Sequence, residues 1–479
     1  MKQINKSIYL IFLLAALTSS CNKFDDAINT DPNNPVKAAA TQLIANAQLS
    51  LADIGTTFDK TASIYGEHYP QYLSNTSFTE NSRYNTVNFN FYPIYAGPLM
   101  NLEKAIEIAN NPNEGPIVNQ IAVAKILKAY FLWHITDRWG AIPFQQALKG
   151  SGNFTPVYDS QQVVYDGLFK LLDEANAAFV SGNIKNDIIY GGDVVRWKKL
   201  GNTIHLLMAL RLSKVDPGKG KAEFQKALAN GIMDKNEDNL TYVHLADKVN
   251  ENYWYTSFTR LKRNWFAVSK PIVDYMLPLN DPRLPVFADK NVAGNYVGLD
   301  YGLPGAVSVV INNFSLLGSA LRQQNSPVYL VTYAQALFAK AEAAKIDWIP
   351  GSDGVAKTNY DLAIQQSILQ WNNNNAAGLS AFMAQMPVAY NPATALRQIA
   401  EQRWVHLFLH GYEGWAEWRR TGFPLLSPAP NNNNAPIPRR EGYPTQEITN
   451  NGANYSAAVG SFPYGGADNL NSRVWWDKP

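Results

Sequence analysis

An apolar stripe at helical spacing constrains this chain more than any other feature of its sequence. Apolar side chains between Val118 and Trp139 recur at intervals of three or four residues: Ile121, Ala124, Leu127, Phe131 and Ile135. This spacing places them on one helix face, which must be buried against another element. Similar alanine-rich patterns predict helices at 41–53, 99–110, 118–139, 161–181, 196–214, 222–230, 329–345, 358–371 and 392–410. The sequence therefore predicts a predominantly all-α fold.

One pair of predicted helices, 329–345 and 358–371, also indicates how the helices pack. Small residues alternate with large aromatic ones in this pair: Ala334, Ala341, Ala344 and Ala363 beside Tyr333, Phe338 and Tyr360. Small side chains let two helices cross closely, and this arrangement resembles degenerate tetratricopeptide packing. The sequence predicts tetratricopeptide-like helix pairs that serve as a scaffold.

Long irregular segments separate the helices, mainly at 54–98, 239–325 and 424–479. Glycine, proline, asparagine and aromatic residues crowd together in them. Loops of this length are usually functional or disordered. Their Trp and Tyr content favours order, because large aromatic side chains gain much from burial. We expect these segments to form an ordered, irregular, loop-rich lobe.

The N-terminus has the layout of an export signal. Lys2 and Lys6 precede an apolar run at 8–17, and small residues lead to Cys21, the only cysteine in the chain. The run is too short to span a bilayer. A single thiol has no intramolecular disulfide partner, and the segment resembles a bacterial lipobox, although Thr18 stands where an aliphatic residue is usual. We predict that lipid on Cys21 anchors the protein to a membrane; the alternative is ordinary secretion with a spare thiol.

The predicted organisation is a signal peptide at 1–20, a flexible tether at 21–40 and a single domain at 41–479. The helical scaffold would lie mainly at 41–53, 99–230 and 329–423. Removing the signal peptide takes Lys2 and Lys6 from 41 basic residues and nothing from 39 acidic ones, so the mature chain would be formally neutral. A nucleic-acid partner would demand a basic face, so none is expected.

No motif predicts an enzyme. His406 and His410 share a helix face, but Leu407 stands where a metalloprotease carries its glutamate. The segment 234–245 lacks the glycine and the closing glutamate of a calcium loop. The chain also has no Gly-x-Ser-x-Gly nucleophile elbow. We therefore expect no catalysis, no cofactor and no metal ion.

Several separate motifs, spread over the chain in a fixed order, carry a family resemblance. They are LKAY at 127–130, TDRWGAIP at 136–143, NDPRL at 280–284, QRW at 402–404, EGWAEWRRTGFP at 413–424 and RVWWD at 473–477. Together they resemble the SusD/RagB family of nutrient-binding outer-membrane lipoproteins, most closely its SusD-like subgroup with a carboxy-terminal Trp-rich signature.

The resemblance implies a surface-exposed binding protein of the outer membrane that delivers oligosaccharides to a TonB-dependent transporter. Peptide capture for the same transporter system is one alternative. A structural adaptor without any small ligand is another. Within the signature, we expect Trp415, Trp418, Arg419 and Arg420 to hold the carboxy-terminal segment against the helices, through stacking and charge-assisted hydrogen bonds.

Two irregular segments, 68–92 and 252–265, combine aromatic rings with amides and charged groups. Sugar rings stack their C–H faces on Tyr or Trp and need fixed donors and acceptors for their hydroxyls. The candidate ligand contacts in these segments are Tyr69, Tyr72, Arg83, Tyr84, Trp254 and Tyr255. The alternative for each ring is that it packs the core of the lobe itself.

Overall fold

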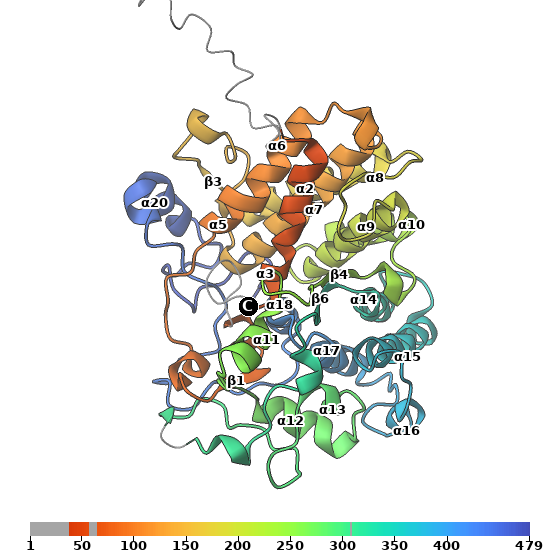
Figure 1. Ribbon diagram of the computed structural model, residues 1–479, viewed down its shortest axis with the longest axis vertical. Helices are drawn as coiled ribbons and strands as arrows, with labels where there is room; N and C mark the ends of the chain where they lie inside the picture. Colours follow the sequence, from red (N-terminus) through yellow and green to blue (C-terminus); the bar gives the residue numbers. More distant parts are fainter. Residues whose placement is uncertain (1–37, 57–64, 307–308) are drawn as a thin grey trace, which may run out of the picture. The chain divides into compact units, whose positions relative to one another are not determined.

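Helices make up most of the regular structure in the computed structural model (Figure 1), which confirms the all-α prediction. The structure describes residues 38–56, 65–306 and 309–479. The predicted signal peptide, Cys21 and nearly all of the predicted tether lie outside the described residues. Among the residues that the structure describes, no helix is long and apolar enough to cross a membrane.

The first half of the scaffold is a row of helices in which each contacts the next (Figure 1). Its members are α2 (Ala40–Leu49), α6 (Met100–Ile108), α7 (Ile117–Trp139), α8 (Gln161–Ala178), α9 (Val194–Arg211) and α10 (Pro217–Ala229). Capping side chains mark where several of them begin. Ser160 accepts a hydrogen bond from Val163 N at the start of α8, and Asp193 accepts from Val195 N at the start of α9.

The second half contains α14 (Tyr333–Lys345), α15 (Ser352–Trp371), α17 (Ala395–His406) and α18 (Gly411–Thr421). Helix α14 packs on α15, as predicted, and also contacts α9 of the first row. The four alanines expected at the crossing are fully buried. Helix pairs therefore pack side by side through both halves of the scaffold.

The predicted helix at 329–345 is wrong in its first turn. Residues 327–331 form strand β6 (Pro327–Val331), which pairs antiparallel with β4 (Leu240–Val243). Thr332 then caps α14 by a capping box with Gln335. Val328, Leu330 and Val331 are buried in the strand, where β-branched and large apolar residues pack well.

Short elements organise the irregular segments. Two further antiparallel pairs join β1 (Leu73–Asn75) to β5 (Phe266–Val268) and β2 (Ile142–Pro143) to β3 (Tyr158–Asp159). The short α-helices are α3 (Leu51–Thr56), α4 (Tyr65–His68), α5 (Tyr92–Ile94), α11 (Tyr253–Tyr255), α12 (Lys270–Met276), α13 (Leu284–Phe287), α16 (Leu379–Met383), α19 (Glu447–Asn450) and α20 (Gly452–Gly460). The 3-10 turns are η1 (Thr79–Arg83), η3 (Pro112–Glu114), η4 (Gly150–Gly152), η5 (Asn236–Asp238), η7 (Leu277–Leu279), η9 (Ile311–Asn313) and η10 (Ser319–Leu321), and the π-helical turns are η2 (Tyr95–Leu99) and η6 (Thr256–Arg260).

The irregular segments share a second core with the helices α15 and α17. Tyr72, Trp254 and Phe287 from these segments are buried there together with Trp371 and Trp404. Burial of these rings supplies the apolar area that keeps the lobe ordered.

Candidate ligand-binding site

The carboxy-terminal signature lies inside the molecule, in a network that we call the ionic cluster. Its members are Asp137, Arg211, Glu342, Arg403, Glu413, Glu417 and Arg420. Arg211 Nε lies 3.1 Å from Asp137 Oδ2, and Arg420 Nη2 lies 2.6 Å from Glu417 Oε2. Burial alone would raise the pKa of Glu417, but the charges of Arg420, Arg403 and Arg211 hold it below its ordinary value. Each charge in the cluster therefore has an opposite charge beside it.

Arg419 binds the cluster to the last part of the sequence. Its guanidinium carbon lies 3.6 Å from the centre of the Trp415 ring and 4.5 Å from that of Trp476. It donates to the carbonyl oxygens of Asp137 and Arg439, at 2.8 and 2.9 Å. These contacts confirm the prediction for Trp415 and Arg419, which hold the carboxy-terminal segment against the helices. Arg420 instead binds Glu342 and Glu417 within the ionic cluster.

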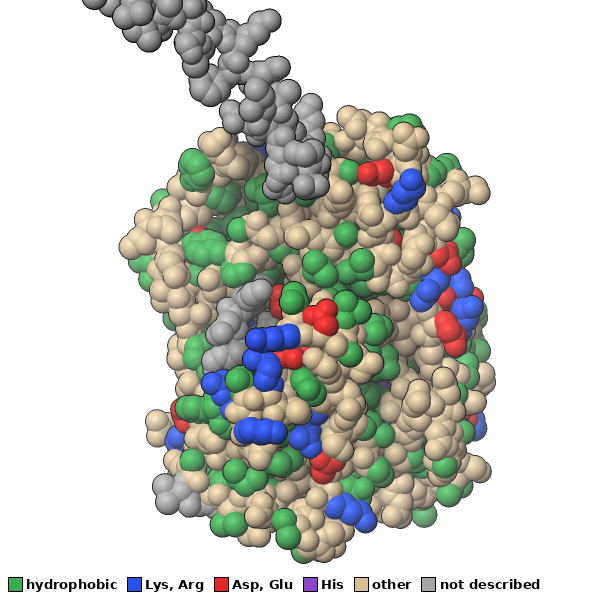
Figure 2. Space-filling view, in the orientation of Figure 1, with side chains coloured by type: hydrophobic (Ala, Val, Ile, Leu, Met, Phe, Trp, Pro, Cys, Tyr) green, Lys and Arg blue, Asp and Glu red, His purple; other side chains and the backbone are tan. Residues whose placement is uncertain are grey.

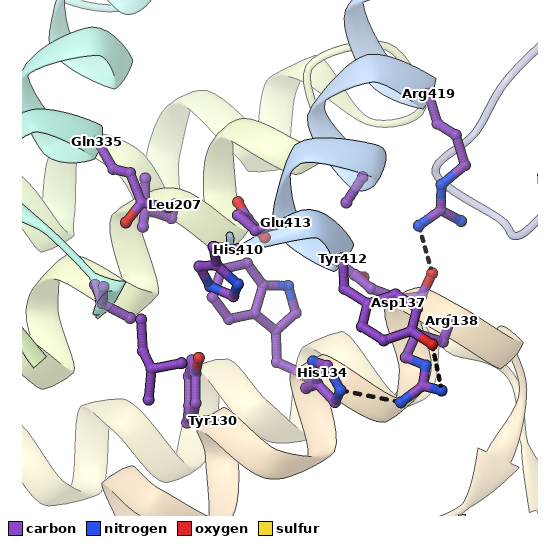
Figure 3. Close-up of a pocket in the computed structure, with 14 residues that line it drawn as sticks. Tyr130, His134, Asp137, Arg138, Leu207, Gln335, His410, Tyr412, Glu413 and Arg419 are labelled. Carbon is purple, nitrogen blue, oxygen red and sulfur yellow. Dashed lines mark hydrogen bonds between the residues drawn. The ribbon is translucent and has the colours of Figure 1, made fainter. Parts of the chain in front are cut away.

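A small cavity lies next to the cluster, lined by His134, Asp137, Arg138 and Tyr412 among others (Figure 3). Arg138 Nη2 donates to the Tyr412 hydroxyl over 3.0 Å. The cavity measures about 20 Å³, which is enough for a water molecule and far too small for a sugar ring. The buried signature is not the ligand site.

His406 and His410, the two histidines that share a helix face, are both buried in the core. Thr332 and Ser367 flank the His406 ring, with Oγ1 2.7 Å from Nε2 and Oγ 2.9 Å from Nδ1. Burial, followed by the charges of Arg283, His410 and Arg403, lowers the pKa of His406 to about 3. Both ring nitrogens are therefore occupied by neighbouring hydroxyls.

Four of the six candidate ligand contacts are core residues rather than exposed stacking faces. Tyr69, Tyr72, Tyr84 and Trp254 are all buried. The Tyr69 ring lies 4.9 Å from that of Trp415. The Tyr72 hydroxyl donates to Trp404 O over 2.6 Å. A ligand has no access to these ring faces, so they shape the site only by supporting its backbone.

The other two candidates, Arg83 and Tyr255, are partly exposed. Arg83 follows β1 in the turn η1, and its Nη1 lies 3.3 Å from Asn431 O. Tyr255 ends the short helix α11. Both keep part of their side chains open to solvent.

Strands β1 and β5 bring the two predicted segments together, with Asn75 opposite Phe266. Just beyond that pair, Thr76 N donates to Trp265 O and the Thr76 hydroxyl donates to Asn264 O, both over 2.7 Å. The bond from the Thr76 hydroxyl to Asn264 O joins residues 188 positions apart, so the two segments form one surface.

The surface presents an aromatic pair. Phe78 is 43% exposed and meets the half-buried Trp265 edge to face, with ring centres 5.1 Å apart. The Arg263 guanidinium lies 4.5 Å from the Trp265 ring centre. We call Phe78, Arg263, Asn264 and Trp265 the aromatic platform. It offers apolar ring area beside hydrogen-bond donors, the combination that a sugar requires.

Basic side chains lie close in sequence to the aromatic platform. Arg260, Lys262 and Arg263 are all exposed at and just after the end of η6. Figure 2 shows Lys and Arg side chains gathered over this part of the face. Arg260 pairs with Glu251. Within the described residues the Arg263 guanidinium donates no hydrogen bond to the protein, so its donors face solvent.

The structure buries four of the six predicted contacts, while other rings of the same two segments, Phe78 and Trp265, are exposed or half-buried. Phe78 was not a candidate, and Trp265, Arg263 and Asn264 were recognised only as part of the second segment. Phe78 stands alone among polar neighbours in Ser77-Phe78-Thr79-Glu80. A single large ring in a polar turn has no apolar neighbours in the sequence to form a buried face with it, and this isolation could have predicted that Phe78 is exposed.

Comparison with known proteins identifies the family. Residues 32–444 match the SusD-like family model described as starch-binding and associating with the outer membrane. The chain therefore belongs to the SusD-like family. No curated protein matches the sequence.

Solved structures agree with the family assignment. A chitin-binding protein is 28% identical, with a TM-score of 0.80 over 92% of this chain and 100% of that one. A SusD homologue from Bacteroides fragilis is 25% identical, with a TM-score of 0.80 over 91% of this chain and 100% of that one. A chitin-binding SusD homologue from Flavobacterium johnsoniae is 23% identical, with a TM-score of 0.78 over 92% and 98%, and shows the shared fold.

Proposed function

We propose that this chain binds an oligosaccharide at the aromatic platform, without catalysis. The observation that carries the proposal is the meeting of exposed Phe78 with Trp265 at the joined ends of the two predicted segments. Stacking on such rings contributes ligand affinity through burial of the C–H face of the sugar. Arg263, Asn264 and Arg83 supply polar groups for the hydroxyls.

A chitin-type oligosaccharide is the first ligand that we propose. The supporting relative is the chitin-binding protein that is 28% identical over 92% of the chain. An N-acetyl group offers a methyl group, a carbonyl acceptor and an N–H donor. The methyl group suits an aromatic ring, and the carbonyl suits the exposed guanidinium of Arg263.

We further propose that lipid on Cys21 anchors the protein to the outer membrane, facing the cell exterior, and that a TonB-dependent transporter receives the ligand. The family model is that of outer-membrane-associated proteins. Two or three acyl chains would make such an anchor effectively permanent, because each buried methylene adds about 0.8 kcal/mol. Cys21→Ala should move the protein from the membrane fraction to the soluble fraction, and an unchanged membrane fraction would contradict the anchor.

Titration calorimetry tests the platform. The purified full-length protein is titrated with chitohexaose, maltoheptaose and a peptide panel. We expect Phe78→Ala/Trp265→Ala to weaken binding of the preferred glycan by about tenfold or more. Thermal unfolding should change little, because Phe78 is exposed and Trp265 half-buried.

The matched control is Phe154→Ala, which removes a ring that is 78% exposed and lies outside the platform. It should leave affinity unchanged. Wild-type affinity in the double variant would overturn the platform, and products released from the glycan would overturn the non-catalytic role. Binding of peptides alone would favour peptide capture.

A further inference from the structure

A second hollow lies away from the platform residues, where the loop after α15 faces η10 and β6. It measures about 750 Å³, large enough for several sugar rings. Its lining includes Tyr329, Trp371 and amide side chains from the run Asn372 to Asn375. It shares no residue with the aromatic platform. We call it the amide groove.

The chemistry of the lining restricts the ligand. No Asp, Glu, Lys, Arg or His is among the described residues that line the amide groove. Asn280, Gln370, Asn372, Asn373 and Asn375 supply side-chain amides instead. An amide can donate and accept hydrogen bonds at once, as a hydroxyl or acetamido group does. An uncharged, amide-lined hollow suits a neutral polyhydroxylated ligand and offers no partner to an ion.

Two aromatic rings form an apolar wall in the groove. Trp371 and Tyr329 meet edge to face, with ring centres 5.4 Å apart and planes at 75°. Trp371 is held in place because its Nε1 donates to His406 O over 3.1 Å. Tyr329 is fixed by the backbone of β6. Rings that are already positioned lose little side-chain freedom when a ligand packs on them.

Polar groups with unmet capacity adjoin the same wall. Gln370 is only 8% exposed; its Oε1 accepts from Asn239 Nδ2 over 3.0 Å, while its Nε2 has no partner within the described residues. Asn372 Nδ2 donates to Pro282 O over 3.1 Å, while its Oδ1 likewise has none there. A buried donor and a buried acceptor that lack partners among the residues lining one groove call for a partner.

We infer that the amide groove is a second glycan-binding site, for a neutral segment of an oligosaccharide. The half-buried Tyr329 ring would pack on a C–H face of the sugar, with the buried Trp371 supporting it from behind, and the free donor of Gln370 and acceptor of Asn372 would bind hydroxyl or acetamido groups. The site acts independently of the platform. A long glycan could therefore be held at two places on one molecule, and the gain in affinity depends on whether it spans both.

Partial steric obstruction of the groove tests the inference. Ala320 is exposed and lines the hollow. Ala320→Trp should obstruct part of the hollow without removing a hydrogen bond, and Ala320→Ser is the matched control that leaves it open. Both are made in the wild-type protein and in the Phe78→Ala/Trp265→Ala variant, and all are titrated with chitohexaose and maltoheptaose.

We expect the platform variant to keep weaker binding of one of these glycans, and Ala320→Trp to reduce that remaining affinity by about fivefold or more. Ala320→Ser should not change it. Remaining binding that is insensitive to Ala320→Trp, or no remaining binding at all, overturns the groove. If the platform variant instead binds the glycan with wild-type affinity, the platform proposal is wrong. In that case the groove is tested in the wild-type background, where an unchanged glycan affinity of Ala320→Trp overturns it.

Discussion

An arginine lies on a tryptophan both next to the ionic cluster and in the aromatic platform, yet the two pairs have opposite surroundings. Buried Arg419 lies over Trp415 and donates to two backbone carbonyls. Exposed Arg263 lies over Trp265, and within the described residues its guanidinium donates to no protein group. Exposed donors beside an open ring can serve a ligand, whereas donors that are buried against backbone carbonyl oxygens hold the fold. The environment of a pair, more than its residue types, separates structure from binding.

Removing one carboxylate from the ionic cluster should have the largest effect. Glu417→Ala leaves Arg211, Arg403 and Arg420 short of a negative charge in a buried place. We expect the free energy of unfolding to fall by about 3–5 kcal/mol, measured by chemical denaturation. Glu417→Gln, which keeps the shape, should cost less than Glu417→Ala. A loss below about 1 kcal/mol for Glu417→Ala would show that water reaches the cluster.

Lowering the pH should reduce the free energy of unfolding through the buried residue His406. His406 has a pKa of about 3, lowered chiefly by burial, while an unfolded histidine has one of 6.5. The unfolded state therefore binds a proton that the folded state does not, and the free energy of unfolding falls as pH drops from 6.5 toward 3. The slope from this residue is up to about 1.4 kcal/mol per pH unit.

His406→Gln isolates this contribution, because the other buried histidines remain in both proteins. Denaturation between pH 7 and pH 5 should show a flatter decline for the variant than for the wild type. Equal slopes would mean that His406 takes up its proton without unfolding.

At the platform, Arg263→Ala should affect ligand binding while sparing stability. The side chain is exposed and makes no hydrogen bond to the described protein, so unfolding should change by less than about 0.5 kcal/mol. Glycan affinity should fall by about threefold to tenfold, from lost hydrogen bonds to the ligand. Arg263→Lys keeps the charge and should recover part of the loss. If Arg263→Ala lowered the free energy of unfolding but left glycan affinity unchanged, Arg263 would be a structural residue and not a ligand contact.

The smallest effect is expected where an ion pair lies in solvent. Lys357 and Asp361 pair on the surface of α15, four residues apart. Asp361→Asn should change the free energy of unfolding by about 0.5 kcal/mol or less. If Asp361→Asn lowered the free energy of unfolding nearly as much as Glu417→Ala, burial would not explain the difference expected between the exposed pair and the ionic cluster.

Helices with a strong period were predictable to within a few residues. The expected helix at 118–139 is α7 (Ile117–Trp139), because its apolar spacing repeats over many turns. The strand at 327–331 was missed because five residues carry too little periodicity to separate a strand from a buried helix turn. Partner strand β4 lies far away in sequence, so the pairing left no local signal.

The sequence indicates which segments carry exposed aromatic and polar groups, but it does not indicate which side chains of those segments point outward. In α11 (Tyr253–Tyr255) successive side chains point in different directions, so Trp254 is buried while Tyr255 is half-exposed. Tyr84 adopts a left-handed backbone, with φ of 62°, and its ring lies in the core. Such orientations depend on tertiary packing, which cannot be predicted from the composition of a segment.

The packing of Trp476 has a consequence for the order of folding. Its Nε1 donates to Asp137 Oδ1 over 2.7 Å, a contact between residues 339 positions apart. Tyr165 of α8 and Arg211 of α9 already bind the Asp137 carboxylate within the first row of helices. That row can therefore pair this charge by itself. Trp476 covers the same carboxylate only once the carboxy-terminal segment has packed, so the last step in completing this core is the closure of a very long loop.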